Sequence, residues 1–184
     1  MIEIRWHGRG GQGAWTASLL LAQAALLEGK YVQSFPEFGP ERMGAPLKAY
    51  TRISSKPITL HCGVYNPDVV VVLDPTLLNS VNVTEGLSLN GSLIVNERKT
   101  PKEIRKYLKI TGRKIWVLSA TDLAMKIINR DIPNTAMLGA TIKATGIVAL
   151  DSLLKVTRDR FSGKIADLNV DLIKLSYEGV RNDE

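Results

Sequence analysis

Cysteine is almost absent from this 184-residue chain, which contains Cys62 alone. A single cysteine excludes an internal disulfide, and it excludes an iron–sulfur cluster or a structural zinc held by cysteines of this chain. Histidine is also scarce, and one of the two histidines, His61, directly precedes Cys62. Because we expect a strand at 58–62, these neighbours should point to opposite faces of a sheet and share no ligand. The sequence predicts a packed thiol, no metal site and a reducing, cytoplasmic location.

Long apolar runs are missing as well. No run approaches the roughly 20 residues that a membrane-spanning helix needs. The first five residues include Glu3 and lack the apolar core of a signal peptide. We therefore expect neither membrane contact nor export.

Acidic residues are in the minority, with 18 Asp and Glu against 24 Lys and Arg, for a formal net charge of +6. Such an excess is compatible with a nucleic-acid or acidic partner. The basic residues are scattered, however, and the nearest approach to a block, at 98–114, is typical of a surface helix and turn. Aromatic residues are not interleaved with these cations, as a platform for single-stranded nucleic acid requires. The sequence favours a solvated basic face and no nucleic-acid partner.

Length and hydrophobic patterning predict one α/β domain over residues 1–184, with enough apolar side chains for an ample core. A strand at 2–6, a glycine-rich turn, a helix at 14–28 and a strand at 31–35 form a Rossmann-like βαβ unit. The unbroken apolar run at 69–73 indicates a central strand covered on both faces. We expect three α/β/α layers around a mostly parallel, mixed sheet, with a hairpin near one edge.

Further elements follow from the remaining pattern. Strands are expected at 47–53, 58–62, 92–96 and 114–118, and helices at 75–81, at 101–108, from Ser119 or Thr121 towards Arg130, and at 134–154. Near the end of the chain, Ile165, Leu168, Leu172 and Leu175 recur at helical spacing, which predicts an amphipathic helix packed on the sheet.

The turn between the first strand and the first helix is the first candidate site. Gly8, Gly10 and Gly13 satisfy the G-x-G-x-x-G pattern of dinucleotide-binding folds, with Arg9, Gly11 and Gln12 between them. The acid that should hold the ribose about 20 residues later is missing, because Glu37 falls after Pro36. Two other interpretations stay open: a tight turn without a ligand, and a turn that offers backbone N–H groups and Arg9 to an anion or an acidic partner.

A proline- and glycine-rich loop, FPEFGPERMGAP at 35–46, is the second candidate. Eleven residues without regular structure are long for a compact domain, and long ordered loops are more often functional. The loop and the glycine turn should lie side by side at the carboxyl edge of the sheet. We predict a partner interface formed by Phe38, Gly39, Pro40, Glu41, Arg42 and Gly44.

Four motifs together resemble a known family. IRWHGRGGQG, FPEFGPERMGAP, NPDVVVVLDPTLL and NTAMLGA occur in the order expected of the gamma subunit of 2-oxoacid:ferredoxin oxidoreductases. The similarity covers about residues 2–150, and it is greatest to the four-subunit archaeal and bacterial enzymes that act on pyruvate or branched-chain 2-oxoacids. The sequence departs from the family at Met43, where arginine or threonine is frequent, and this affects the loop's contacts. The resemblance also places Asn134, in NTAMLGA, at the partner interface.

The resemblance implies an enzyme complex that decarboxylates a 2-oxoacid, reduces ferredoxin and releases acyl-CoA. Thiamine diphosphate, Mg²⁺ and iron–sulfur clusters are then expected in the alpha, beta and delta partner subunits, the delta subunit being ferredoxin-like. This chain is expected to hold no catalytic residue and no metal. Coenzyme A is the substrate that the glycine turn, residues 8–13, would face, although an acidic residue of a partner remains the alternative.

Two other functions compete with this interpretation. A stand-alone NAD- or FAD-dependent enzyme is the runner-up, and the missing ribose acid counts against it. A nucleic-acid-binding module comes third, and the scattered charge counts against it.

Overall fold

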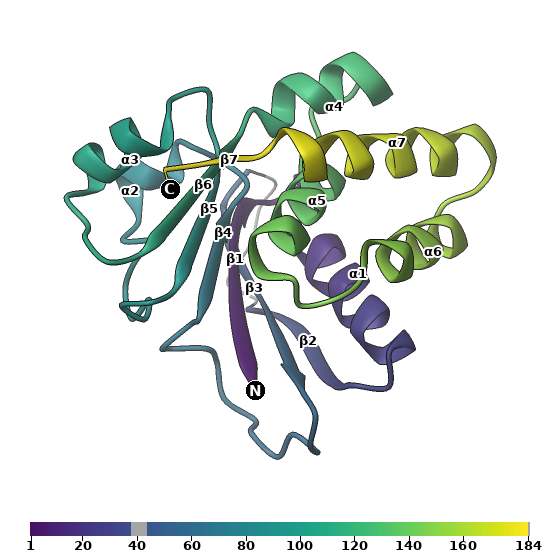
Figure 1. Cartoon of the computed structure of the whole chain (residues 1–184), viewed down its shortest axis with the longest axis horizontal. Coiled ribbons are helices and arrows are strands. Elements are labelled where there is room, and N and C mark those ends of the chain that lie inside the picture. The colour runs from purple at the N-terminus through teal and green to yellow at the C-terminus, as the bar shows by residue number, and fades with distance from the viewer. Residues whose placement is uncertain (38–43, 184) are drawn as a thin grey trace.

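The computed structural model describes residues 1–37 and 44–183 (Figure 1). Their seven strands form one mixed sheet in the order β2-β3-β1-β4-β5-β6-β7. The strands are β1 (Ile2–Arg9), β2 (Tyr31–Glu37), β3 (Pro46–Ser54), β4 (Val69–Val72), β5 (Ser92–Asn96), β6 (Lys114–Leu118) and β7 (Arg181–Asn182). The helices are α1 (Ala14–Leu27), α2 (Leu77–Ser80), α3 (Pro101–Leu108), α4 (Ala120–Ile128), α5 (Asn134–Thr145), α6 (Leu150–Arg160) and α7 (Gly163–Gly179).

The sheet is parallel in its centre and antiparallel at both edges. Strands β1, β4, β5 and β6 run parallel, whereas β3 and β2 continue the sheet antiparallel on one side and β7 does so on the other. This confirms the predicted fold class. The first βαβ unit differs in one respect, because β3 is inserted between β1 and β2. The hairpin expected from the strands at 47–53 and 58–62 is wrong, and the hairpin at the edge is formed by β2 and β3.

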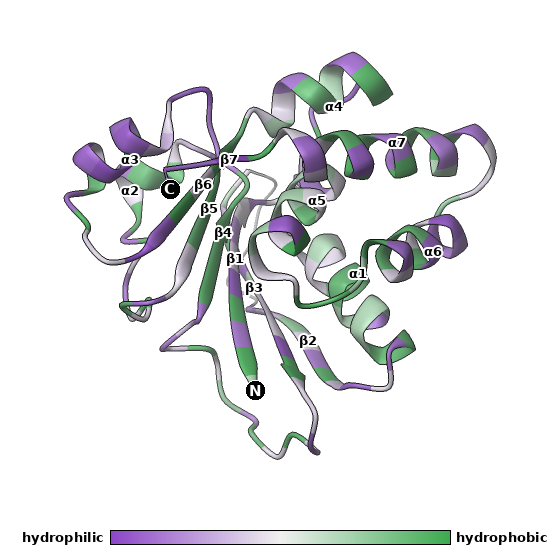
Figure 2. Ribbon diagram, in the orientation of Figure 1, coloured by the Kyte–Doolittle hydropathy of each residue, from purple (hydrophilic) through white to green (hydrophobic). Residues whose placement is uncertain are grey.

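The central strand β4 is buried on both faces, as its apolar run predicts. Val69 and Val71 pack into the core beneath α1 and α5, while Val70 and Val72 pack into a second core beneath α2 and α3. This alternation follows from the two-residue period of a strand. Helices thus cover both faces of the parallel centre (Figure 1), and the strands there are strongly hydrophobic (Figure 2).

On the face opposite α1, the antiparallel half of the sheet is covered by irregular segments of the chain and not by helices. Arg5 is 5% exposed and donates hydrogen bonds to the carbonyl oxygens of Val83 and Val64, at 3.1 and 3.5 Å. Arg52 is 1% exposed, forms an ion pair with Glu3 at 2.6 Å, and donates to the carbonyl of Gly63. Two buried arginines therefore hold irregular segments against the sheet where no helix covers it.

The strand predicted at 58–62 is wrong, because that segment has no regular structure. Its residues Leu60, His61 and Cys62 are exposed, so the predicted packed thiol is wrong too. The alternation of apolar and polar residues at 58–62 therefore belongs to a surface segment, which is held by hydrogen bonds from side chains of the sheet. The Gln33 side chain, for example, donates to the carbonyl of Leu60 at 2.8 Å.

The predicted helix at 134–154 is two helices. Gly146 adopts φ +60°, a left-handed conformation that ends α5, and α6 begins at Leu150. The last helix, α7, packs on α5, α4 and α6 instead of on the sheet, so that prediction was wrong. Its buried side includes Val170 and Ile173, whereas Ile165 remains 57% exposed. None of the helices in the described residues is long and apolar enough to cross a membrane.

Close packing of α5 against α7 depends on Gly139. A Cβ atom at this position would lie 2.4 Å from the carbonyl oxygen of Ile173 and 3.0 Å from the Cβ of Ser176. Backbone cannot yield as a flexible side chain does, so α5 and α7 would have to separate. The absence of a side chain at Gly139 therefore sets the distance between these helices.

We expect Gly139→Ala to lower the free energy of unfolding by about 1–3 kcal/mol, the usual cost of overpacking a core. Denaturant unfolding of the purified chain measures this. Gly179→Ala is the matched control, because a Cβ there would meet only the Leu118 side chain, at 3.9 Å. The control should stay within about 1 kcal/mol of the parent. Equal effects of the two substitutions would contradict the proposed packing constraint.

Candidate functional site

The glycine turn lies at the carboxyl edge of the sheet, where the chain changes face. Helix α1 follows β1 on one face, and α2 follows the neighbouring strand β4 on the other (Figure 1). In open α/β sheets, ligands bind outside the carboxyl ends of strands at such a change of face. The topology thus makes this edge of the sheet the candidate site.

Two glycines give the turn its shape. Gly11 has φ +97° and Gly13 has φ +77°, both in the left-handed region that side chains disfavour. The N–H of Gln12 donates to the carbonyl of Arg9 at 3.1 Å and closes the turn. Gly13 then leads into α1, which begins without a side-chain cap from the described residues. The first N–H groups of a helix have no intrahelical partner, so this end of α1 favours an anion.

Asn134, which the family resemblance places at a partner interface, lies directly against this turn. A Cβ atom on Gly13 would be 2.4 Å from Asn134 Nδ2, so only glycine allows the approach. Asn134 is the first residue of α5, is 6% exposed, and accepts a hydrogen bond from the N–H of Thr135 at 2.8 Å. The starts of α1 and α5 therefore meet at one point.

Gln12 fixes the turn to the end of β4. Its Oε1 accepts from the N–H of Arg9 at 2.7 Å, and its Nε2 donates to Asp74 Oδ2 at 2.8 Å. Burial of the Asp74 carboxyl opposes its ionisation, but hydrogen bonds from Thr76 and Gln12 and the charge of Arg9 prevail and lower its pKa. Asp74 is thus a stable carboxylate that organises the turn.

Arg9 has structural partners on two other segments. Its Nε lies 3.1 Å from Asp74 Oδ2, its Nη2 donates to Thr76 Oγ1 at 2.9 Å, and its Nη1 donates to the carbonyl of Gly44 at 3.0 Å. The backbones of Gly10 and Gly44 are also joined, by an N–H to carbonyl bond of 3.3 Å. The guanidinium therefore fastens the glycine turn to the end of β4 and to the start of β3.

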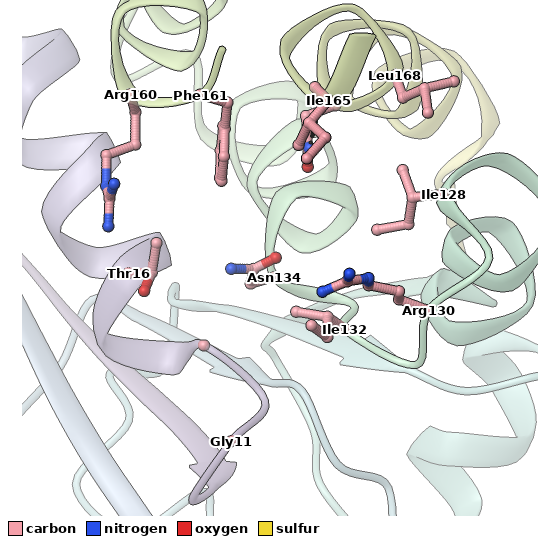
Figure 3. Close-up of a pocket in the computed structure, with 12 residues that line it drawn as sticks. Gly11, Thr16, Ile128, Arg130, Ile132, Asn134, Arg160, Phe161, Ile165 and Leu168 are labelled. Carbon is pink, nitrogen blue, oxygen red and sulfur yellow. Dashed lines mark hydrogen bonds between the residues drawn. The ribbon is translucent and has the colours of Figure 1, made fainter. Parts of the chain in front are cut away.

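A cavity of about 430 Å³ opens beside the turn (Figure 3). Gly11, Gly13 and Thr16 form one wall, and Asn134 lies at its centre. Two arginines, Arg130 and Arg160, extend into it from different segments of the chain. The remaining lining is mostly apolar: Ile128, Ile132, Phe161, Ile165, Leu168 and Asn169. The cavity thus combines a helix start, two cations and an apolar wall.

Arg130 and Arg160 were missed by the sequence reasoning. They lie in the loop after α4 and at the end of α6, and more than 100 residues separate each from the glycine turn. Neither forms an ion pair with the residues the structure describes, and both are exposed. No local pattern marks them, since only the packing of α5, α6 and α7 brings them to the turn.

Part of the predicted partner interface falls outside the described residues. The segment 38–43 is not among the described residues, and it contains Phe38, Gly39, Pro40, Glu41 and Arg42. That these residues contact a partner remains a prediction. Gly44 is described: it is exposed, has φ +86°, and its carbonyl accepts from Arg9. The end of the loop therefore does adjoin the glycine turn, as predicted.

His7, the histidine closest to the site, is buried and is not placed to transfer protons there. His7 is 2% exposed, and its Nε2 accepts from Arg5 Nε at 3.0 Å. Burial, with the nearby charges of Arg5 and Lys48, lowers the pKa of His7 to about 3, so the imidazole stays neutral. In the described part of the chain, no three His, Cys, Asp or Glu side chains come together as a metal site.

Comparison with known proteins agrees with this architecture. Residues 3–179 match the family described as pyruvate ferredoxin/flavodoxin oxidoreductase. The chain belongs to this family. The pyruvate/ketoisovalerate oxidoreductases common subunit gamma of Pyrococcus furiosus is 51% identical over 178 residues, which cover 97% of this chain and 96% of that protein. The predicted family resemblance is confirmed.

Solved structures extend the comparison to the fold. The crystal structure of pyruvate oxidoreductase subunit PORC from Thermotoga maritima has a TM-score of 0.90 at 48% identity, covering 100% of this chain and 98% of that one. The 2-oxoglutarate:ferredoxin oxidoreductase of Magnetococcus marinus shares the fold, with a TM-score of 0.79 at 19% identity over 30% of its chain. The alternative of a stand-alone NAD or FAD enzyme finds no support among these relatives.

The contact between Gly13 and Asn134 gives a prediction about stability. Gly13→Ala should lower the free energy of unfolding by about 2–4 kcal/mol, because left-handed backbone strain adds to the clash with Asn134. Gly11→Ala, where a Cβ meets no atom within 4 Å, should cost only the strain, about 1–2 kcal/mol. Thermal or denaturant unfolding gives both values.

A double-mutant cycle isolates the clash. In an Asn134→Ala background, the cost of Gly13→Ala should fall close to that of Gly11→Ala, since the Asn134 atoms at 2.4 and 3.0 Å are gone and only its Cβ, at 3.2 Å, remains. An unchanged penalty in that background would show that the approach of Asn134 does not constrain the turn.

Proposed function

We propose that this chain is the gamma subunit of a 2-oxoacid:ferredoxin oxidoreductase, a complex that converts a 2-oxoacid and coenzyme A to acyl-CoA and CO₂ while reducing ferredoxin. Nearly full-length similarity to gamma and PORC subunits carries this proposal. The names of these relatives favour pyruvate, with ketoisovalerate as a second 2-oxoacid. Alpha, beta and delta subunits would complete the complex.

The cofactors are proposed to reside in those partner subunits. Thiamine diphosphate is bound through Mg²⁺, which needs oxygen ligands, and iron–sulfur clusters need several thiolates. The chain's single, exposed cysteine cannot supply those thiolates, and in the described residues no three His, Cys, Asp or Glu side chains come together. The role of this chain is then to bind and position, and a cytoplasmic location follows for a complex of this kind.

Coenzyme A is the substrate whose chemistry suits the cavity beside the glycine turn. Its phosphates are anionic and its pantetheine arm is largely apolar. The start of α1 and the guanidinium groups of Arg130 and Arg160 favour phosphate, while Phe161 and Ile165 offer an apolar wall. Within residues 8–13, the glycines would admit the ligand. Arg9 and Gln12 would hold the turn in shape through Asp74.

The loop at 38–44 is proposed to contact a partner subunit at the same edge of the sheet. Gly44 and the glycine turn are joined by hydrogen bonds, so a partner on the loop would adjoin the cavity. A coenzyme A bound in the cavity would then be enclosed between this chain and a partner.

The isolated chain is expected to fold but to show no activity. Its unfolding should be cooperative, and reduction of a viologen dye with pyruvate and coenzyme A should stay at background. Co-expression with the alpha, beta and delta subunits should give one complex on size exclusion, and activity should appear. Dye reduction by the chain alone would contradict the proposed role.

Loss of the two cavity arginines tests the coenzyme A site in the assembled complex. Arg130→Ala and Arg160→Ala should each raise KM for coenzyme A by about tenfold or more, for a charge-assisted bond worth about 1.5–3 kcal/mol. KM for pyruvate should stay unchanged. Arg158→Ala is the matched control, because Arg158 is exposed on α6 and pairs with Asp167 at 2.8 Å outside the cavity. An unchanged KM for coenzyme A in both variants would argue against the site.

A further inference from the structure

One segment of the chain carries the whole formal excess of positive charge, so the basic residues are less scattered than expected. Residues 98–114 contain eight Lys or Arg and one acid, Glu103, for a formal charge of +7, whereas the complete chain has +6. The rest of the molecule is therefore close to neutral. In the fold, this segment is α3 with its flanking turns, on the face of the sheet opposite α1 (Figure 1), and α3 is strongly hydrophilic (Figure 2).

Several of these cations are not neutralised within the molecule. Arg98 pairs with Asp122 and Arg105 pairs with Asp183, each at 2.6 Å. Lys102, Lys106 and Lys109 are exposed and form no ion pair with any residue that the structure describes. With Lys99 and Tyr107, these three lysines form what we call the α3 surface.

The α3 surface is held rigidly. Thr100 and Glu103 form a capping box at the start of α3, in which each side chain accepts from the other's backbone N–H. Ile104 is fully buried in the core beneath the helix. A fixed helix therefore presents the lysines in one direction, as a preorganised docking surface requires.

An aromatic anchor and a hollow lie within the same surface. Tyr107 is 48% exposed, Lys99 Nζ lies 5.4 Å from its ring centre, and its hydroxyl donates to Asn79 Oδ1. Beside it is a hollow of about 220 Å³, whose lining reaches Thr76. Because Thr76 also binds Arg9, the α3 surface is continuous with the candidate site.

We propose that the α3 surface docks an acidic protein that the complex binds and releases, namely the carrier that accepts its electrons. Stable subunit interfaces are depleted of lysine, whereas a lysine-rich, solvated surface suits a brief encounter steered by charge. Redox partners form small, transient interfaces of this kind. The inference rests on the proposed function, since that reaction requires a protein acceptor to come and go.

Charge reversal in the assembled complex tests the proposal. With the organism's own ferredoxin as acceptor at low ionic strength, Lys102→Glu/Lys106→Glu should raise KM for ferredoxin about tenfold and weaken its dependence on salt. The rate with a viologen dye should be unchanged. The neutral pair Lys102→Gln/Lys106→Gln should give a smaller increase, and it serves if the reversed pair folds poorly.

The matched control is Lys155→Glu/Lys174→Glu, which changes net charge equally at exposed positions of α6 and α7, away from α3. This pair should leave KM for ferredoxin near the parent value. An equal rise in the control would show that only overall charge matters and would overturn the proposal.

Three further results would also overturn it. They are an unchanged KM for ferredoxin in both α3 variants, loss of this subunit from the complex on size exclusion, and binding of a single-stranded RNA probe that the variants abolish while ferredoxin kinetics stay normal. Absence of viologen activity in the unsubstituted complex would contradict the proposed function instead, so the two failures are distinguishable.

Discussion

The close approach of Gly13 to Asn134 is the contact on which the candidate site depends. It brings together the starts of α1 and α5, which belong to chain segments 120 residues apart, and it leaves no room for a Cβ atom. Because α5 lies between the sheet and α7, its position also determines where α7 passes. The cavity is lined by the glycine turn, the starts of α1 and α5, the loop before α5 and residues of α6 and α7, so the contact between Gly13 and Asn134 lies at its wall.

Burial of α5 in turn requires small residues and satisfied polar groups. Gly139 lets the backbone of α7 come close, and Thr135 Oγ1 bonds to Asn169 Oδ1 at 2.8 Å across the same interface. Asn169 Nδ2 donates to the carbonyl of Ile165, so the polar groups between the helices are paired. A buried hydroxyl without such a partner would be costly. The cavity wall on α7 is thereby fixed to the helix that carries Asn134.

Local sequence patterns predicted much of this fold, namely the elements whose bounds depend on hydrophobic periodicity and on capping or turn residues. The strands at 92–96 and 114–118 and the helix at 101–108 have the expected bounds, since each combines a clear period with strong capping or turn residues. The segment 58–62 looked like a strand but has no neighbour to pair with, because β2 takes the place beside β3. Strand pairing is decided by the whole sheet, which no local pattern encodes.

Local sequence patterns do not predict the candidate site either. The arginines of this chain show why, because they fall into two groups. The sequence marked Arg9 through its glycine neighbours, yet the structure gives its guanidinium partners on two other segments of the chain. The guanidinium groups of Arg5 and Arg52 likewise donate their hydrogen bonds to irregular segments that pack against the sheet. Arg130 and Arg160 have no comparable partners among the described residues, and tertiary packing alone brings them to the turn. Charge available to a ligand or partner therefore resides where internal hydrogen bonding is incomplete. The cavity arginines and the lysines of α3 meet that criterion, whereas Arg5, Arg9 and Arg52 do not.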